Sequence, residues 1–361
     1  MSTFNQALEN GIGAVGDYLR LSFDDVAVQQ SHCAASSGAV AELEGKLRQH
    51  YRMKHALCVS NATTALYVLG LALELKDCDF VTTPLTYGAT IAGMLLLGNR
   101  PRFADTDSQT MTLEPDSAAR EITPATKAII SVDMFGVPAD SRSLRRIADE
   151  RGLWLISDSS QSLGATRDGM PAGVFADALV VSFTAGKTLF AGEGGAIVTN
   201  NSGLYEKLVY WSQHPLRQRL ELGLHLDNEF AFNARISPLS AVWANAMFGA
   251  ALKKLRLLQK DYRRIIGLLN KSGLTEPIDF TNGKIESAYF RLVASWKDGP
   301  REDPLTGFLL NHGIKAAIEP LPVRLLYKQP FVLARRLDGE ESFYCANAEM
   351  CVRKGFVLRP A

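Results

Sequence analysis

The chain lacks an excess of charge of either sign, since 39 lysines and arginines stand against 38 aspartates and glutamates in 361 residues. Proteins that bind nucleic acid or anionic lipid need a basic field, so this balance argues against both functions. Long apolar runs are also missing: the longest, near residues 89–98, is about half of the ~20 residues that a membrane-spanning helix needs. A secretory signal has a basic region followed by an apolar stretch, and the first residues show no such pattern. These absences favour a soluble, cytoplasmic protein.

Cysteine is scarce, and its five residues form no C-x-x-C pair, which favours free thiols in a reducing compartment. The histidines show no H-E-x-x-H pattern and no metal spacing beside cysteines, so no metal site is predicted. The elbow G-x-S-x-G and the fingerprint G-x-G-x-x-G after a strand are missing too. Gly186, Lys187 and Thr188 imitate the end of a P-loop, but Val181 stands where its first glycine belongs. Metal hydrolases, serine hydrolases and dinucleotide oxidoreductases thereby lose their main support.

The sequence does contain a succession of short apolar runs separated by helix-compatible segments. The runs cover residues 56–60, 80–84, 101–105, 127–133, 153–158, 178–183 and 195–200. Most are continuous rather than alternating, which is typical of strands buried on both faces of a largely parallel sheet. Residues 62–76 show helical spacing behind a candidate N-cap at Asn61, and residues 140–151 lie between Asp140 and Gly152, a candidate cap at each end. This alternation predicts a three-layer α/β domain.

The pattern changes after about residue 245. A basic amphipathic stretch at 251–269 predicts a helix, 287–296 alternates like a strand, and a proline-rich segment follows near 320–330. The length of the chain also favours two domains over one. We therefore expect a large domain over residues 1–245, including the N-terminal segment, and a small α+β domain over 246–361.

Polar residues follow several of the predicted strands. Asp158 ends one strand, Ser182 nearly ends the next, and Lys187 lies just beyond it, where open α/β sheets bind ligands. The turn at 60–65 opens a predicted helix, so its backbone N–H groups offer an anion site, and Tyr87 could cover a planar ligand. Each residue alone is more typical of a structural role: Asp158 of a cap, Lys187 of a solvated loop and Tyr87 of packing. Together, a lysine amine, an acid partner and a phosphate turn are what a pyridoxal 5'-phosphate (PLP) enzyme needs.

Several longer motifs stand in one order along the chain. They are NATTAL (61–66), TPLTYGAT (83–90), SDSSQSLGA (157–165), the stretch 175–200 and FNARISPLSA (232–241). With these motifs the sequence resembles the DegT/DnrJ/EryC1/StrS family, the sugar aminotransferases of the aspartate-aminotransferase fold, from about residue 42 to 250. The resemblance implies a three-layer α/β/α PLP-dependent transferase fold (fold type I). Its sheet would be mostly parallel and seven-stranded, with a smaller C-terminal α+β domain.

The resemblance also implies roles around the cofactor ring. Lys187 would form the internal aldimine with PLP and then shuttle the proton between substrate carbon and cofactor carbon. Asp158 would pair with the pyridine nitrogen and keep it protonated. Gln161 would contact the phenolic oxygen of the ring, and Tyr87 would stack on its face.

A second group is implied at the cofactor phosphate. Ser182 and the backbone of Ala62 and Thr63 would hold the phosphate within one subunit. Asn233 would reach the phosphate of the neighbouring subunit's cofactor, so the resemblance implies a homodimer.

The reaction implied is transamination in a biosynthetic pathway. An amino group would pass from glutamate or glutamine to a keto-sugar or related ketone, in two half-reactions of a ping-pong mechanism. An alternative is another PLP reaction on the same fold, namely elimination, decarboxylation or carbon–carbon bond formation on a non-sugar substrate. Lys187 argues against the family's dehydratases, in which histidine typically replaces it. A non-catalytic protein is disfavoured because Asp158, Gln161, Ser182 and Lys187 are all present.

Four positions depart from the family's pattern. Thr184 stands where a histidine or aromatic residue is usual, Thr188 where asparagine is usual, and Asp133 and Arg324 where histidine is usual. These changes leave the cofactor residues in place but weaken the case for a typical nucleotide-linked keto-sugar. Arg324 could bind a carboxylate or phosphate bidentately, and a surface arginine on a proline-rich loop is an equally good interpretation.

Overall fold

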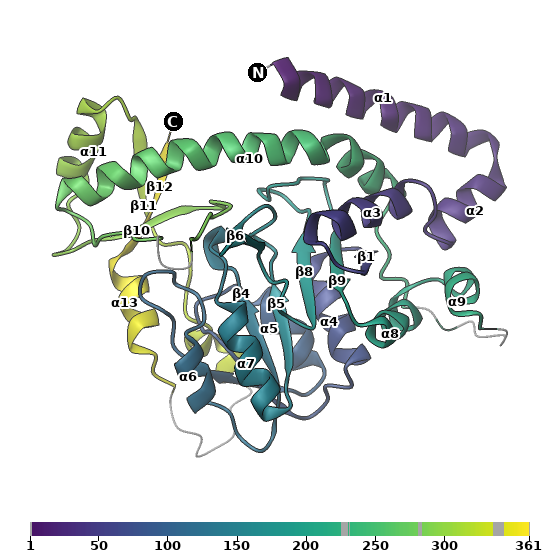
Figure 1. Cartoon of the computed structure of the whole chain (residues 1–361), viewed down its shortest axis with the longest axis horizontal. Helices are drawn as coiled ribbons and strands as arrows, with labels where there is room; N and C mark the ends of the chain where they lie inside the picture. Colours follow the sequence, from purple (N-terminus) through teal and green to yellow (C-terminus); the bar gives the residue numbers. More distant parts are fainter. Residues whose placement is uncertain (1, 225–229, 231, 281–283, 335–342, 361) are drawn as a thin grey trace.

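The computed structural model describes residues 2–224, 230, 232–280, 284–334 and 343–360. Its body is a seven-stranded sheet between two layers of helices, with a small second sheet at one end of a long helix (Figure 1). The strands of the large sheet are β1 (His55–Val59), β2 (Asp79–Thr82), β3 (Arg100–Phe103), β4 (Thr126–Val132), β5 (Trp154–Asp158), β8 (Ala178–Ser182) and β9 (Gly195–Thr199). Each strand overlaps one of the seven predicted runs. The α/β class and the seven-stranded sheet are confirmed.

The strand order is β1-β9-β8-β5-β4-β2-β3. Strands β3, β2, β4, β5 and β8 pair in parallel, while β9 is antiparallel to both of its neighbours, β1 and β8. All five residues of β8 and of β9 are buried. Burial on both faces explains why these runs are continuous rather than alternating.

Helices cover both faces of the sheet. On one face lie α4 (Ala62–Ala72), α5 (Ala89–Leu96) and α8 (Ser202–Ser212); on the other lie α3 (Ala39–Tyr51), α6 (Pro115–Arg120), α7 (Ser141–Arg151) and α10 (Pro238–Ser272). The α7 helix has the predicted caps, since Asp140 accepts the backbone N–H of Ser143 and Gly152 adopts a φ of 62°. The α4 helix ends at Ala72, short of the predicted 76, because the chain turns at Glu74, whose φ is 57°.

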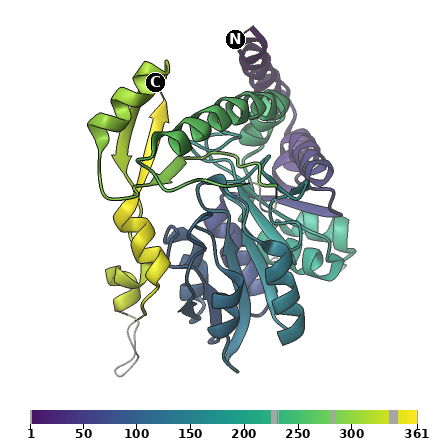
Figure 2. The ribbon, with the colours of Figure 1, turned by 60° about the vertical axis from the view of Figure 1, so that its left-hand side comes forward.

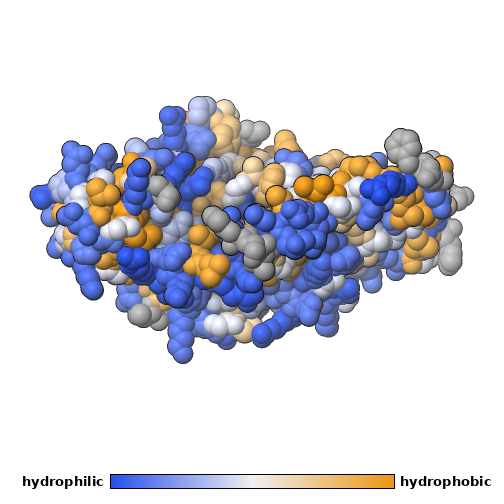
Figure 3. All heavy atoms as spheres, turned by 90° about the horizontal axis from the view of Figure 1, so that it is seen from above, coloured by the Kyte–Doolittle hydropathy of each residue, from blue (hydrophilic) through white to orange (hydrophobic). Residues whose placement is uncertain are grey.

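Two N-terminal helices, α1 (Ser2–Asp24) and α2 (Val26–Ala34), precede this body, and α1 packs along α10 (Figure 1). Leu8, Ile12 and Leu19 of α1 are exposed. Seen from above, this side of the molecule mixes apolar and hydrophilic residues (Figure 3). Among the described residues, no helix combines the length and the apolarity needed to cross a membrane.

The C-terminal part forms a second, antiparallel sheet in the order β10-β12-β11. Its elements are β10 (Leu292–Ser295), α11 (Glu302–Asn311), β11 (Ala316–Pro320), α12 (Pro330–Leu333), α13 (Ala346–Lys354) and β12 (Gly355–Pro360). Figure 2 shows this sheet and α11 beside one end of α10, with α13 running down the side of the body. The α10 helix is continuous across residue 245, the boundary that we expect between two domains. Short elements complete the fold: the two-residue strands β6 (Thr166–Arg167) and β7 (Met170–Pro171), and 3-10 turns at Met134–Gly136 and Leu326–Lys328.

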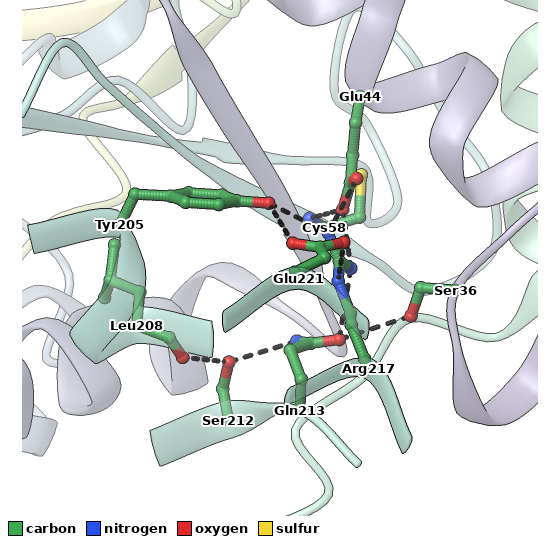
Figure 4. Close-up of polar contacts among 9 residues, drawn as sticks. All are labelled: Ser36, Glu44, Cys58, Tyr205, Leu208, Ser212, Gln213, Arg217 and Glu221. Atoms are coloured by element: carbon green, nitrogen blue, oxygen red, sulfur yellow. Dashed lines mark hydrogen bonds and ion pairs between the residues drawn. The ribbon is translucent and has the colours of Figure 1, made fainter. Parts of the chain in front are cut away.

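A buried arginine fastens the short helix α9 (Pro215–Leu222) to the body (Figure 4). Arg217 is 1% exposed. Its two Nη atoms donate to Glu44 at 3.0 and 2.9 Å, and Nε donates to Glu221 at 2.8 Å. Gln213 and Tyr205 accept the remaining bonds at 3.3 and 3.2 Å. Every N–H of the guanidinium therefore has an acceptor, which is how proteins tolerate a buried charge.

Candidate active site

Seven of the eight predicted site residues line one cavity of about 200 Å³. They are Ala62, Thr63, Tyr87, Asp158, Gln161, Ser182 and Lys187. The cavity lies where β5 and β8 end, beside the N-terminus of α4. The carboxyl edge of a parallel sheet is the place where α/β proteins bind ligands. Sequence reasoning missed other residues that line it, among them Thr86, Thr90 and Ser160. Thr86 and Thr90 stand inside the motif at 83–90 and Ser160 inside the motif at 157–165, so these two motifs were the available signals.

The first turn of α4 offers donors to an anion. The Asn61 side chain accepts the backbone N–H of Thr64 at 2.8 Å, confirming the predicted N-cap. The N–H groups of Ala62 and Thr63 have no acceptor within the part of the chain that the structure describes. Backbone comes close here: a Cβ added at Gly195 would lie 2.8 Å from the nitrogen of Ala62. Free N–H groups at a helix N-terminus suit a phosphate.

Asp158 is held at the end of β5 with its carboxylate in the cavity. The side chain is buried, Oδ2 accepts the hydroxyl of Thr90 at 2.7 Å, and Oδ1 accepts the N–H of Ser160 at 3.2 Å. Thr90 is itself bonded to Thr86 at 2.8 Å. These bonds fix the orientation of a carboxylate that still has lone pairs for a ligand.

Lys187 stands in the loop after β8, half-buried, with Nζ 4.4 Å from the centroid of the Phe290 ring. Burial lowers the pKa of this amine, and the charge of Arg291 lowers it further, while Asp158 acts in the opposite direction. A lowered pKa raises the share of neutral amine, which is the nucleophilic form.

Gln161 is oriented by a backbone contact. Its Oε1 accepts the N–H of Phe135 at 2.8 Å. Among the described residues its amide NH₂ contacts only Met134 Sδ, at 3.8 Å, so it remains available as a donor to a ligand. Tyr87 lines the same cavity and is 42% exposed, which places its ring toward solvent. The Ser182 hydroxyl is buried and hydrogen-bonded to that of Thr184 at 3.0 Å.

Asp133, one of the departures from the family's pattern, lies behind this site and is buried. Its carboxylate accepts the hydroxyls of Ser159 and Ser162 at 2.6 and 2.7 Å, and the N–H of Ala139 at 2.8 Å. Burial raises the pKa of Asp133 to about 6, although these hydrogen bonds act in the opposite direction. The side chain thus ties the loop that carries Gln161 to the end of β4, a role that sequence alone did not reveal.

Two predicted residues lie outside the cavity of their own chain. Asn233 is exposed, has a φ of 56°, and does not line the cavity. Arg324 is exposed on the segment that precedes Leu326–Lys328. Within the described part of the chain, no group of three or more histidine, cysteine, aspartate or glutamate side chains is placed to hold a metal ion.

The residues present fit PLP. Donors for a phosphate, an acid for a pyridine nitrogen and a partly desolvated amine converge on one cavity, and the glycine at 195 leaves the phosphate turn its space. Ala62, Thr63 and Ser182 would hold the phosphate, Asp158 and Gln161 the ring, and Lys187 the reactive carbon.

Comparisons with known proteins identify an aminotransferase family. The model of the DegT/DnrJ/EryC1/StrS aminotransferase family matches residues 25–358. The GDP-perosamine synthase of Vibrio cholerae is 33% identical over 283 residues, 77% of this chain and 75% of that protein. The alignment with GDP-perosamine synthase of Escherichia coli O157:H7, 34% identical over 173 residues, spans only about half of each chain, 48%. Among solved structures, NtdA from Bacillus subtilis with bound cofactor PMP has a TM-score of 0.78 at 22% identity, covering 99% of this chain and 78% of that one.

Proposed function

We propose that this chain, which belongs to the DegT/DnrJ/EryC1/StrS aminotransferase family, is a PLP-dependent enzyme that transfers an amino group from glutamate or glutamine to a keto-sugar or related ketone. The observation that carries the proposal is the convergence of Lys187, Asp158, Gln161 and the α4 turn on one cavity. The similarity to GDP-perosamine synthases supports a nucleotide-linked keto-sugar as the acceptor.

The protein's own groups divide the work. When bound, PLP supplies an aldehyde that condenses with amines and a pyridine ring that withdraws electrons from the attached carbon. Asp158 keeps a proton on the pyridine nitrogen, which sustains that withdrawal. Lys187 Nζ takes and returns the proton of the substrate carbon that bears nitrogen, because its lowered pKa leaves it able to act as a base. Burial removes water from the site, which strengthens both the pairing of Asp158 with the protonated pyridine nitrogen and the ability of Lys187 to act as a base.

We also propose the arrangement of the chain around this site. A large unit over residues 1–245 and a small one over 246–361 would be joined through α10, which crosses their boundary. A homodimer would bring the exposed Asn233 to the partner's cofactor phosphate. A reducing compartment such as the cytoplasm suits the five cysteines, all of which are free thiols.

The test of the cofactor site compares Lys187→Ala with Lys271→Ala, an exposed lysine near the end of α10. The wild type and Lys271→Ala should show a visible absorption band of bound PLP that glutamate or glutamine bleaches. Lys187→Ala should lose the bleaching by either donor. A wild-type protein that takes up no PLP would refute the cofactor assignment. Bleaching by Lys187→Ala at the wild-type rate would refute the role of this lysine.

The role of Asn233 can be tested with mixed dimers of Lys187→Ala and Asn233→Ala. If Asn233 acts across the interface, one site of each hybrid combines an intact Lys187 with an intact Asn233 from the other chain, and it should bind PLP as the wild type does. If Asn233 acted within its own chain, every site of the hybrid would lack one of the two groups. A monomeric protein, or hybrids no better than the parents, would contradict the proposal.

A further inference from the structure

A segment of the C-terminal part, residues 287–291, is fixed directly against the candidate active site. The Gly136 carbonyl accepts the N–H of Ala288 at 2.8 Å and the hydroxyl of Ser287 at 3.0 Å. The carbonyl of Phe135 accepts the N–H of Arg291 at 3.3 Å. The approach is close, since a Cβ added at Gly136 would lie 2.9 Å from two backbone nitrogens of the segment. Phe135 is also the residue whose N–H orients Gln161, so this segment is built onto the site.

One aromatic ring of this segment contacts two cations. Lys187 Nζ lies 4.4 Å and the Arg291 guanidinium carbon 4.8 Å from the centroid of the Phe290 ring. Because both charged groups lie over the same ring, the separation between Lys187 Nζ and the Arg291 guanidinium cannot exceed the sum of these two distances. The charge of Arg291 helps to lower the pKa of Lys187, which agrees with that proximity.

Arg291 has no carboxylate partner among the residues that the structure describes. It is half-buried, its Nε is buried without an acceptor in that part of the chain, and Nη1 reaches only the carbonyl of Phe290 at 3.5 Å. Arg217, by contrast, has all its donors satisfied. A buried donor without an acceptor destabilises the folded state. Arg102 and Arg145 also have a buried Nε without an acceptor among the described residues, but both pair with carboxylates through their Nη atoms, which Arg291 does not.

We propose that Arg291 binds a carboxylate of the amino donor, glutamate or glutamine. The inference rests on the proposed function, and it deepens it by assigning the donor's anion to a named residue. In an amino acid, the α-carboxylate is attached to the carbon that also carries the reacting nitrogen, so its binding group must stand close to the lysine. Arg291 lines a small neighbouring cavity and contacts the same Phe290 ring as Lys187, and its planar guanidinium matches a carboxylate with two parallel hydrogen bonds. Arg324, which the sequence suggested as a ligand for a carboxylate or phosphate, is exposed, and among the described residues it has no contact with the Phe290 ring that Lys187 and Arg291 share.

The test uses PLP-loaded protein and measures binding as well as reaction. Wild type, Arg291→Gln, Arg291→Lys and the exposed α7 variant Arg146→Gln are titrated with succinate, an unreactive dicarboxylate, with succinamide as its neutral analogue. A lost charge-assisted hydrogen bond is worth about 1.5–3 kcal/mol, which corresponds to a Kd about 10-fold to 100-fold higher. We expect that rise for succinate with Arg291→Gln, a smaller one with Arg291→Lys, and none with Arg146→Gln. Succinamide should bind all four proteins alike.

A parallel titration with GDP distinguishes two anions that Arg291 could bind, the carboxylate of the amino donor and the phosphates of a nucleotide-linked acceptor. Weaker GDP binding by Arg291→Gln, with succinate unaffected, would assign the arginine to the acceptor and overturn the proposal. Equal succinate affinity of Arg291→Gln and wild type would overturn it as well, even if glutamate still bleached the cofactor band. Failure of the wild type to react with glutamate or glutamine would count against the aminotransferase instead, and succinate binding would still test Arg291. If Arg291→Gln does not fold, the affinity of Arg291→Lys decides, and a wild-type value refutes the proposal.

Discussion

The carboxyl group of Asp133 makes a prediction about stability and pH that can be worked from the structure. The side chain is 1% exposed, and burial raises its pKa from 3.8 to about 6. The folded protein therefore holds this proton more tightly than the unfolded chain does. Stability from this group is fully present below its unfolded pKa and is lost as the pH rises through the folded value. Above about pH 6 the folded state carries a buried charge that it binds through Ser159, Ser162 and Ala139.

The size of the effect follows from the shift. A shift of about two pKa units corresponds to about 3 kcal/mol, at about 1.4 kcal/mol per unit. Asp133→Asn removes the titration and keeps the shape. The free energy of unfolding of the variant minus that of the wild type should therefore increase by up to about 3 kcal/mol between about pH 4 and about pH 7.5. Other titrating groups are shared by both proteins and cancel in this difference.

Urea unfolding of the two proteins across this pH range measures the difference. Ser159→Ala provides a second check, because it removes a hydrogen bond that favours the carboxylate and so should move the pH step upward. A difference that stays level with pH would mean that burial does not raise the pKa of Asp133. A difference that falls with rising pH would show that the three donors outweigh burial. Either result would refute the reasoning.

Two further predictions concern the phosphate turn and the α9 anchor. Gly195→Ala should raise the Kd for PLP at least about 10-fold, because the added Cβ would lie 2.8 Å from the nitrogen of Ala62. The control Gly249→Ala, which has open space around the added Cβ, should bind PLP as the wild type does. Equal PLP affinities of the two variants in equilibrium dialysis would argue against a phosphate at this turn. Arg217→Met should lower the free energy of unfolding by about 3–5 kcal/mol, since it leaves Glu44 buried and unpaired. Adding Glu44→Gln should recover part of that loss in urea unfolding, and a single-variant loss under about 1 kcal/mol would contradict the importance of the pair.

The large sheet was predictable because its strands are marked locally. Continuous apolar runs such as 178–183 coincide with strands buried on both faces. The α7 helix carries both its start signal, Asp140, and its stop signal, Gly152, in the sequence. The length of α10 was less accessible, because the sequence pattern changes near residue 245 and two glycines, Gly249 and Gly267, lie within the helix without ending it.

The predicted cofactor residues were identified through the motifs that surround them, and the cavity brings seven of the eight together. Phe290 and Arg291 were not found, because the contact between Phe290 and Lys187 joins residues about a hundred positions apart, and neither Phe290 nor Arg291 has a local signal of its own. Asp133 stood out as a departure from the family's pattern, yet only the structure shows the serine hydroxyls that surround its carboxylate. Contacts made across the fold are the part that one-dimensional spacing cannot supply.

The most direct test of the central claim is product analysis of a single half-reaction. PLP-loaded protein is mixed with glutamate in the absence of any acceptor, the visible band is followed, and 2-oxoglutarate is quantified. A transaminase should release 2-oxoglutarate in an amount equal to the PLP that is bleached, and added 2-oxoglutarate should restore the band. Release of carbon dioxide or ammonia in place of 2-oxoglutarate, or no reaction with either glutamate or glutamine, would contradict the account.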